Sequence, residues 1–349
     1  KMTVTVTQPT INVREELADL RKPSGIAGEA MLRAETPQEQ FNLIGAGRRN
    51  LIINGAMQVW QRGTVFSGGG LYLADRWYSD NTGGGNSGQS TDAPNDFAYS
   101  FKANPSGSSN AVFRQAIELP AAGVGGIFRS GNSFTLSFYL KSDSAGEPIN
   151  IYVASGTVVT GTTTVHVNDT ATGFVTSTSW TRYTYTFECK DVGATDTCLN
   201  VVPYILSPSD YVYITGVQLE LGKVATPFEH RSYGEELALC QRYYYAHVDG
   251  ADQTIGAGAN YSSSILTVGV NFPVTMRAEP TAIYPDVTNG FTFYRNGGND
   301  LFDTFATVAS PSLNAAFMDV TSGISGTAGH GGRVKTAAAG SYLHFKAEL

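Results

Sequence analysis

The sequence has little charge and no long apolar runs. Asp, Glu, Lys and Arg make up 15% of its 349 residues, against a usual share of about 25%. Lys and Arg are scattered along the chain, singly or in isolated pairs, so there is no basic stripe to meet a phosphate backbone. Apolar runs stay far below the roughly 18 residues of a membrane span, and the N-terminus alternates Thr and Val where a signal peptide is apolar. We expect no nucleic-acid partner, no membrane span and no export signal.

Cysteine is also scarce. Cys189, Cys198 and Cys240 are the three cysteines of the chain, which are too few for a disulfide framework, and none belongs to a C-x-x-C pair. Cys189 and Cys198 are near enough in sequence to close a hairpin, whereas a protein made in a reducing cytosol keeps such thiols free. Free thiols are favoured, and the pairing of Cys189 with Cys198 stays open at this level.

Motifs of metal, phosphate and nucleophilic sites are missing. The five histidines show neither H-E-x-x-H nor any local metal-ligand spacing. There is no G-x-S-x-G elbow and no glycine-rich phosphate loop between a strand and a helix. Glycosidase chemistry needs two carboxylates at a set distance, and Asp75, Asp92 and Asp96 are expected to be solvated loop carboxylates. The sequence predicts no catalytic residue, no metal ligand and no cofactor.

Glycine and aromatic residues are abundant. The chain has 39 glycines, 18 Phe, 18 Tyr and 3 Trp, a composition typical of strands joined by glycine turns. Phe134, Leu136, Phe138 and Leu140 alternate with smaller or polar residues, which indicates a strand with one wet face. Similar segments span residues 51–60, 71–79, 97–102, 112–119, 133–141, 149–154, 158–167, 180–189, 197–205 and 211–220. They predict a two-sheet β-sandwich or jelly roll over residues 50–232.

Two further parts flank this sandwich. Residues 1–49 predict an arm with a short strand at 3–7 and two short helices, capped at Asn12 and Thr36. Ser232 and Glu235 form a capping box that opens a linking helix with Leu237, Cys240, Tyr243 and Tyr244 at helical spacing. Segments 263–272, 281–284, 290–294, 315–320 and 340–347 then read as strands. The prediction is a mainly β chain whose residues 233–349 form a smaller C-terminal β-sandwich domain.

Five aromatic residues are candidates for contact with a sugar, because a ring face covers the apolar side of a pyranose while polar neighbours bind its hydroxyls. They are Trp60, Trp77, Tyr78, Tyr152 and Tyr213. Packing competes for the same residues, and Trp77 and Trp180 are expected in the core more than on a platform. The polar loop at 81–96 is a candidate contact surface because loops carry recognition on β scaffolds.

Three blocks of the sequence resemble a known group of proteins. Residues 50–63 read NLIINGAMQVWQRG and residues 74–77 read ADRW. Residues 216–222, 225–231 and 237–244 read GVQLELG, ATPFEHR and LALCQRYY. Together with FPVTMRAEPT at 272–281 and FKAEL at 345–349, they resemble tail-fibre and related virion proteins of bacteriophages. Residues 134–142 and 179–184 resemble strands of jelly-roll carbohydrate-binding modules.

The resemblance implies a non-enzymatic structural protein on the surface of a virion, assembled in the host cytoplasm. It implies a homotrimeric tail fibre or tail-associated receptor-binding protein that attaches to host-surface polysaccharide. Residues 1–49 would join it to other tail or virion proteins, and weak glycan contacts would gain avidity from repeated copies. The alternatives are a depolymerase tailspike and a purely structural adaptor or head fibre.

Overall fold

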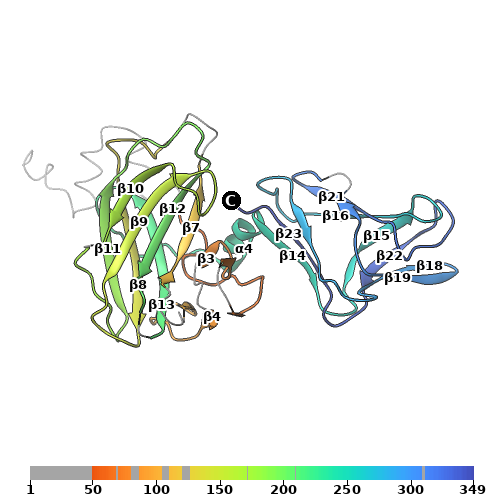
Figure 1. The fold of residues 1–349 in the computed structure, drawn as a ribbon, viewed down its shortest axis with the longest axis horizontal. Helices are drawn as coiled ribbons and strands as arrows, with labels where there is room; N and C mark the ends of the chain where they lie inside the picture. Colours follow the sequence, from red (N-terminus) through yellow and green to blue (C-terminus); the bar gives the residue numbers. More distant parts are fainter. Residues whose placement is uncertain are drawn as a thin grey trace, which may run out of the picture. The chain divides into compact units, whose positions relative to one another are not determined.

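A computed structural model of the chain describes residues 49–67, 70–79, 86–103, 110–119, 126–170, 172–208, 210–308 and 311–349. The strand and helices expected in the N-terminal arm lie outside these residues. Asn50–Leu349 forms one compact unit. Its strands make up four antiparallel sheets, so the prediction of a mainly β chain with sandwich architecture is confirmed (Figure 1).

The first two sheets pack face to face as a jelly-roll sandwich (Figure 1). The first sheet has the order β1 (Val65–Ser67), β4 (Asn86–Ser90), β5 (Ser100–Ala103), β13 (Val212–Leu221), β8 (Ser133–Ser142), β11 (Thr181–Glu188). The second has the order β10 (Thr164–Asp169), β9 (Ile149–Gly156), β12 (Cys198–Ile205), β7 (Arg114–Glu118), β3 (Trp77–Ser79), β2 (Leu71–Tyr72), with β6 (Ala111–Val112) also on β12. We call them the six-stranded and the seven-stranded sheet of the sandwich.

Alternation along the strands places the core between these two sheets. Phe134, Leu136, Phe138 and Leu140 of β8 are completely buried in one cluster, as the sequence pattern predicts. Burial of such a side chain contributes roughly 2 kcal/mol to stability. The residues between them must point to the other face of the six-stranded sheet, because side chains of a strand alternate between faces.

Residues 244–346 form two further sheets around a second core. A three-stranded sheet has the order β14 (Tyr244–Asp249), β23 (Tyr342–Lys346), β17 (Thr281–Ile283). The other has the order β19 (Gly298–Phe302), β18 (Phe291–Arg295), β22 (Gly331–Thr336), β15 (Thr254–Asn260), β16 (Leu266–Asn271), β21 (Ala315–Val320), β20 (Thr307–Val308). Phe291, Phe293, Val334 and Phe345 lie at the centre of this core.

Helix α4 (Tyr233–Gln241) connects the two cores in sequence. The predicted capping box is present: Ser232 Oγ accepts from the backbone N–H of Glu235, and the Glu235 side chain accepts from the N–H of Ser232. The helix ends sooner than its periodicity predicts, because Tyr244 already pairs with β23 as the first residue of β14. Buried Cys240 is the end of the apolar helical face.

The structure corrects two strand predictions and one loop prediction. Residues 51–60 form turns, because Asn54 has a φ of 55° and its side-chain oxygen accepts from the N–H groups of Gln58 and Val59. In the segment 158–167 only the end belongs to β10, since Gly161 closes a turn back to the carbonyl of Val158. The expected loop at 81–96 contains β4, whose Ser and Gly residues offer no hydrophobic alternation.

The motif blocks at 50–63 and 216–222 lie against each other. The N–H of Leu51 donates to the carbonyl of Leu219 at 3.0 Å, and the N–H of Val217 donates to the carbonyl of Gly55 at 3.0 Å. A Cβ on Gly55 would lie 2.1 Å from the Val217 carbonyl oxygen, which only glycine allows. Asn50 adds side-chain hydrogen bonds to Val217 and Leu219. These motif residues therefore build the fold.

A buried charge network connects the ADRW motif to the C-terminal residues. Arg62 pairs with Asp75 at 2.8 Å and with Glu348 at 2.6 Å, and Arg76 pairs with the second oxygen of Glu348. The Arg76 guanidinium also lies 3.5 Å from the centroid of the Tyr243 ring. Asp75 has no exposed surface, so the expectation of a solvated loop carboxylate was wrong at this position.

The three cysteines are free, buried thiols. Burial raises the pKa of Cys189 and of Cys198 to about 11. Both side chains are therefore protonated and unreactive at neutral pH.

His344 makes the second core sensitive to acid. It is buried on β23, with Nδ1 2.7 Å from the Tyr244 hydroxyl, and burial lowers its pKa from 6.5 to about 4. Between these two pH values the unfolded chain binds a proton that the folded chain does not, so stability falls as pH falls through this window. We expect a loss on the order of 2 kcal/mol.

Urea unfolding from pH 7 to pH 4 measures this loss, and His344→Gln should flatten its pH dependence. His330→Gln is the matched control because His330 is exposed. An equal pH dependence for wild type and His344→Gln would contradict the assignment.

Candidate functional site

The outer face of the six-stranded sheet carries polar and aromatic side chains. On β8, Tyr139 and Lys141 alternate with the buried core residues. Tyr139 pairs in register with Arg182 of β11 on one side and with Thr215 of β13 on the other. Three neighbouring strands thus place a tyrosine ring, a guanidinium group and a hydroxyl at one level of the face.

A segment after β13 folds back over part of this face. We call residues 223–231 the strap. Its backbone satisfies two outward-facing but buried side chains of β13: the N–H of Thr226 donates to Glu220 Oε2 at 3.0 Å, and the N–H of Glu229 donates to Gln218 Oε1 at 2.8 Å. Unpaired, these buried groups would cost about 1–3 kcal/mol each. The ATPFEHR motif is therefore held on the sheet by the GVQLELG motif.

Gly216 makes room for two rings above β13. It lies at a bulge, where the register between β13 and β8 shifts between Thr215 and Gln218, and its φ is +59°. A Cβ at this position would lie 2.6 Å from Phe97 Cζ and 2.8 Å from Tyr139 Cδ2. Both rings can meet over the strand only because residue 216 has no side chain.

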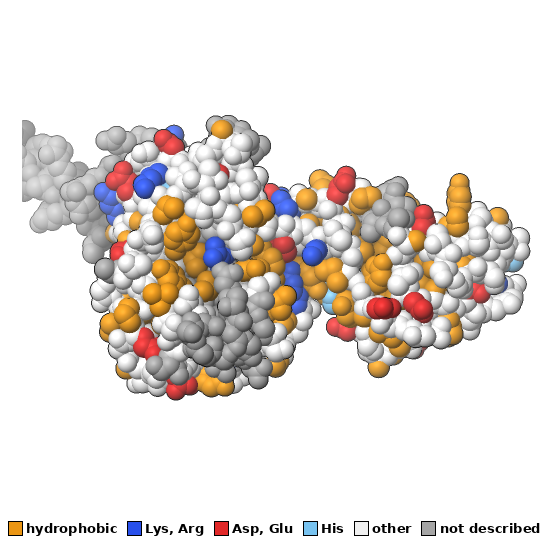
Figure 2. Space-filling model, in the orientation of Figure 1, with side chains coloured by type: hydrophobic (Ala, Val, Ile, Leu, Met, Phe, Trp, Pro, Cys, Tyr) orange, Lys and Arg blue, Asp and Glu red, His pale blue; other side chains and the backbone are white. Residues whose placement is uncertain are grey.

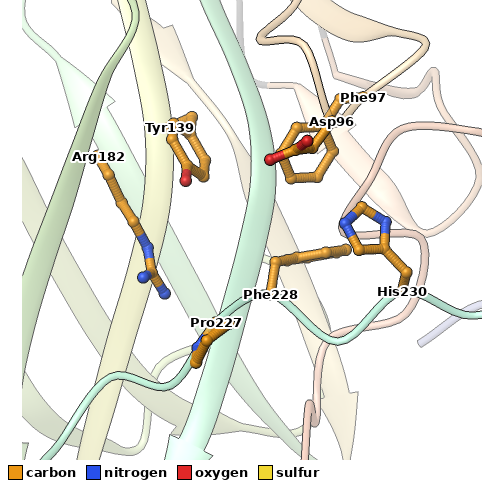
Figure 3. A pocket seen from close by; sticks show the side chains of 7 residues that line it. All are labelled: Asp96, Phe97, Tyr139, Arg182, Pro227, Phe228 and His230. Carbon is orange, nitrogen blue, oxygen red and sulfur yellow. The ribbon is translucent and has the colours of Figure 1, made fainter.

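These elements enclose an open pocket of about 610 Å³. Its lining residues are Asp96, Phe97, Tyr139, Arg182, Pro227, Phe228 and His230. Figure 3 shows Tyr139 and Arg182 on one side of β13 and Asp96 and Phe97 on the other. The Phe97 ring centroid lies 5.5 Å from that of Tyr139 and 5.0 Å from that of Phe228. The strap supplies the remaining wall.

Arg182 is the cationic group of the pocket. One of its Nη atoms donates to Ser137 Oγ at 3.0 Å and to the Thr226 carbonyl at 2.5 Å. Its Nε is buried and has no hydrogen-bond partner among the described residues. Asp96 and His230 are exposed at the rim. Ring faces combined with a few convergent polar groups suit a ligand that has an apolar face and hydroxyl groups.

A second set of side chains continues the outer face beside the pocket. Lys102 of β5, Tyr213 of β13 and Lys141 of β8 pair in register, and Trp180 precedes β11 next to Lys141. We call these four residues the lysine row. Asp92 holds the loop 91–99 against the lysine row, because its carboxylate accepts hydrogen bonds from Trp180 Nε1 at 2.9 Å and from Lys141. The hydrogen bond from Lys141 lowers the pKa of Asp92.

Trp77 and Trp60 do not present free ring faces. Trp77 is completely buried, and its indole N–H donates to the carbonyl of Asn54 at 2.9 Å. It belongs to the core, so its candidacy for sugar contact is corrected. Trp60 is half-buried, donates to the Met57 carbonyl and packs edge-on against Phe101. Both tryptophans hold residues 50–63 on the first core.

The three tyrosine candidates are scattered over both sheets. Tyr78 and Tyr152 lie half-buried on β3 and β9 of the seven-stranded sheet, away from the pocket. Tyr213 lies in the lysine row but is only 7% exposed, because Lys102 and Lys141 lie over its ring. Burial, followed by the nearby Asp143, raises its pKa to about 12. The structure therefore does not bring the five predicted aromatics together.

The residues that line the pocket were largely missed in the sequence. Tyr139 stands at an outward position between Phe138 and Leu140, so the alternation of β8 contained the signal. Trp180 was expected in the core but is half-exposed beside Lys141. Asp96 is the last residue of the loop 81–96 that was singled out as a contact surface, and Phe97, which was expected to begin a strand, follows it directly. No sequence pattern showed that the strap would bring Phe228 to the same place.

The described residues contain no metal-ligand cluster, no membrane-spanning helix and, on the face drawn in Figure 2, no continuous basic patch. Within them, no group of three or more His, Cys, Asp or Glu side chains could hold a metal ion. Helix α4 has nine residues, and no helix in the described ranges has the length and hydropathy to cross a membrane. On the face drawn in Figure 2, basic side chains form separate spots among uncharged surface.

No protein-family model and no curated protein matches the chain. Among solved structures, it is similar to the CBM22-1 xylan-binding domain of Xyn10C from Paenibacillus barcinonensis, at 10% identity, 51% of this chain, 99% of that chain and a TM-score of 0.32. It is similar to TmCBM61 in complex with β-1,4-galactotriose, at 11% identity over 50% of this chain and 99% of that chain, with a TM-score of 0.30. It is also similar to the enzymatically active domain of tailspike protein 4 of bacteriophage CBA120, at 16% identity over 50% of this chain and 21% of that chain, with a TM-score of 0.29. Scores this low carry no argument about function, which must rest on this chain's own surface.

Proposed function

We propose that residues 50–349 are the glycan-binding part of a non-enzymatic bacteriophage virion protein of the tail-fibre type. The observation that carries the proposal is the pocket over Gly216. There the rings of Phe97 and Tyr139 can cover the apolar side of a sugar, while Arg182 and Asp96 bind its hydroxyls. The pocket is open, so a sugar within a longer polysaccharide can enter it.

The composition of the pocket favours binding over cleavage. Hydrolysis of a glycosidic bond uses two carboxyl groups on opposite sides of the bond. Of the described residues that line the pocket, Asp96 is the only carboxylate. Asp92 is engaged by Lys141 and Trp180. Release of reducing ends from host polysaccharide, lost on replacement of Asp96, would instead establish a depolymerase.

The virion assignment rests on the motif blocks at 50–63, 74–77 and 216–244, which resemble phage tail-fibre proteins. In this proposal residues 1–49 attach the protein to other virion proteins, and a homotrimer presents three pockets whose weak contacts add up. Antibody labelling of purified particles locates the protein on the virion. Light scattering of the purified protein measures how many chains form the oligomer. If the β domains prove to be buried among neighbouring virion proteins, a structural adaptor or a head fibre is favoured instead.

Replacing Tyr139 by Ala tests the pocket directly. We expect binding of the multimerised protein to an array of bacterial envelope polysaccharides to weaken about tenfold, because loss of one ring contact removes roughly 1–1.5 kcal/mol. Phe317→Ala is the matched control, since Phe317 is an exposed aromatic on β21, outside the pocket. Equal binding by wild type and Tyr139→Ala would contradict the proposed site.

A further inference from the structure

The lysine row lies directly beside the pocket. Lys141 is two residues from Tyr139 on β8, and Trp180 is two residues from Arg182 at β11. Two residues along a strand span roughly 7 Å, so neighbouring sugars of one chain can reach both places. The loop 91–99 crosses the same face, with Asp92 at the row and Phe97 in the pocket.

Lys102 is the charge in this row that is left for a ligand. Asp92 already accepts from Lys141 and Trp180, and Asp143 accepts from the Tyr213 hydroxyl at 3.3 Å. Lys102 takes part in none of the ion pairs found among the described residues. Its ammonium lies 3.6 Å from the centroid of the Tyr211 ring. Cation–π contact orients an ammonium without neutralising it.

The overall charge of the protein makes this arrangement distinctive. The chain carries a net charge of -7, yet Arg182 and Lys102 stand on one face, and no ion pair with a carboxylate is found for either among the described residues. Both lie beside aromatic rings, which exclude water and strengthen a charge interaction. A ligand that supplies an anion next to a sugar ring matches this face.

We propose that the lysine row is a second subsite, in which Lys102 binds the carboxylate of an acidic sugar that adjoins the sugar in the pocket. The inference rests on the proposed function and adds the substrate class, an acidic polysaccharide. Tyr211 and Trp180 flank the bound sugar, and Lys141 stays engaged with Asp92.

The test uses polygalacturonate, alginate and hyaluronate, each as the free acid and after reduction of its carboxyl groups. We expect the multimerised wild-type protein to bind at least one free acid five-fold or more tightly than its reduced form, with a preference that fades as salt is added. Lys102→Gln should abolish the preference and Lys102→Arg should keep it. Lys346→Gln is the matched control, since Lys346 is exposed on β23.

The outcomes separate this inference from the proposed function. If Lys102→Gln keeps the full preference, or if reduced and acidic forms bind equally, the second subsite is overturned. The proposed function then still stands, provided that Tyr139→Ala weakens binding of the reduced forms. If none of these polysaccharides is bound in either form, the acidic-glycan inference is rejected, and the envelope-polysaccharide array decides the proposed function separately.

Discussion

Glu348→Gln is expected to lower the free energy of unfolding by about 3–5 kcal/mol, because it leaves the buried Arg76 without a carboxylate and leaves Arg62 with Asp75 alone. Arg62 and Arg76 both pair with Glu348, and their side chains are 12% and 1% exposed. Arg76 has no exposed route to water that would replace the lost partner. Urea unfolding should show a midpoint lower by roughly 1–2 M.

Tryptophan fluorescence reports on the relevant part of the chain. The three tryptophans, Trp60, Trp77 and Trp180, all belong to the first sandwich, whereas Glu348 follows β23 of the second core. A lower midpoint in this signal would show that the C-terminal residues stabilise the first sandwich. Glu188→Gln is the control, since Glu188 is exposed on β11 and should change stability by less than about 0.5 kcal/mol. Equal unfolding midpoints for Glu348→Gln and Glu188→Gln would show that the ion pairs of Glu348 do not stabilise the protein.

Gly216→Ala should destabilise the protein and close the pocket at once. Alanine at a φ of +59° costs about 1 kcal/mol, and its methyl group would displace the rings of Phe97 and Tyr139, adding roughly 1–3 kcal/mol. We expect a total loss of about 2–4 kcal/mol and a glycan affinity at least tenfold weaker. Thermal unfolding and polysaccharide binding measure the two effects.

Gly173→Ala separates backbone strain from crowding. Gly173 also has a positive φ, +76°, but a Cβ there would meet nothing within 4 Å. This variant should lose about 1 kcal/mol and keep full glycan binding. If Gly216→Ala binds glycan as tightly as Gly173→Ala does, the two rings are not the binding surface.

The pocket results from a division of labour among the motif residues. Asn50 and Gly55 dock residues 50–55 on β13, and Gln218 and Glu220 tie down the strap. Gln218 and Glu220 face outward in the alternation of β13 but are buried, because the backbone of the strap covers them. The motif residues that make these contacts thus build the framework of the site, whereas pocket-lining residues such as Phe97, Tyr139 and Arg182 lie outside the motif blocks.

Local pattern was sufficient where one face of a strand is apolar or a helix carries its own cap. Phe134 to Leu140 reveal the buried side of β8, and the Ser232–Glu235 box shows where α4 begins. Each of these signals spans fewer than ten residues of the chain. The pattern failed for β15 and β22, where glycines stand in place of apolar residues and pairing with neighbouring strands alone creates the strand.

The sequence by itself determined a mainly β, charge-poor protein, because composition and alternation depend on neighbours along the chain. Tertiary structure alone decided which scarce charges are buried and which face outward. Asp75 and Glu348 stand 273 residues apart in sequence and share Arg62 in the interior. Phe97, Tyr139 and Phe228 meet only because the loop 91–99, β8 and the strap converge over Gly216. Contacts between such distant segments are set by packing, which no local pattern records.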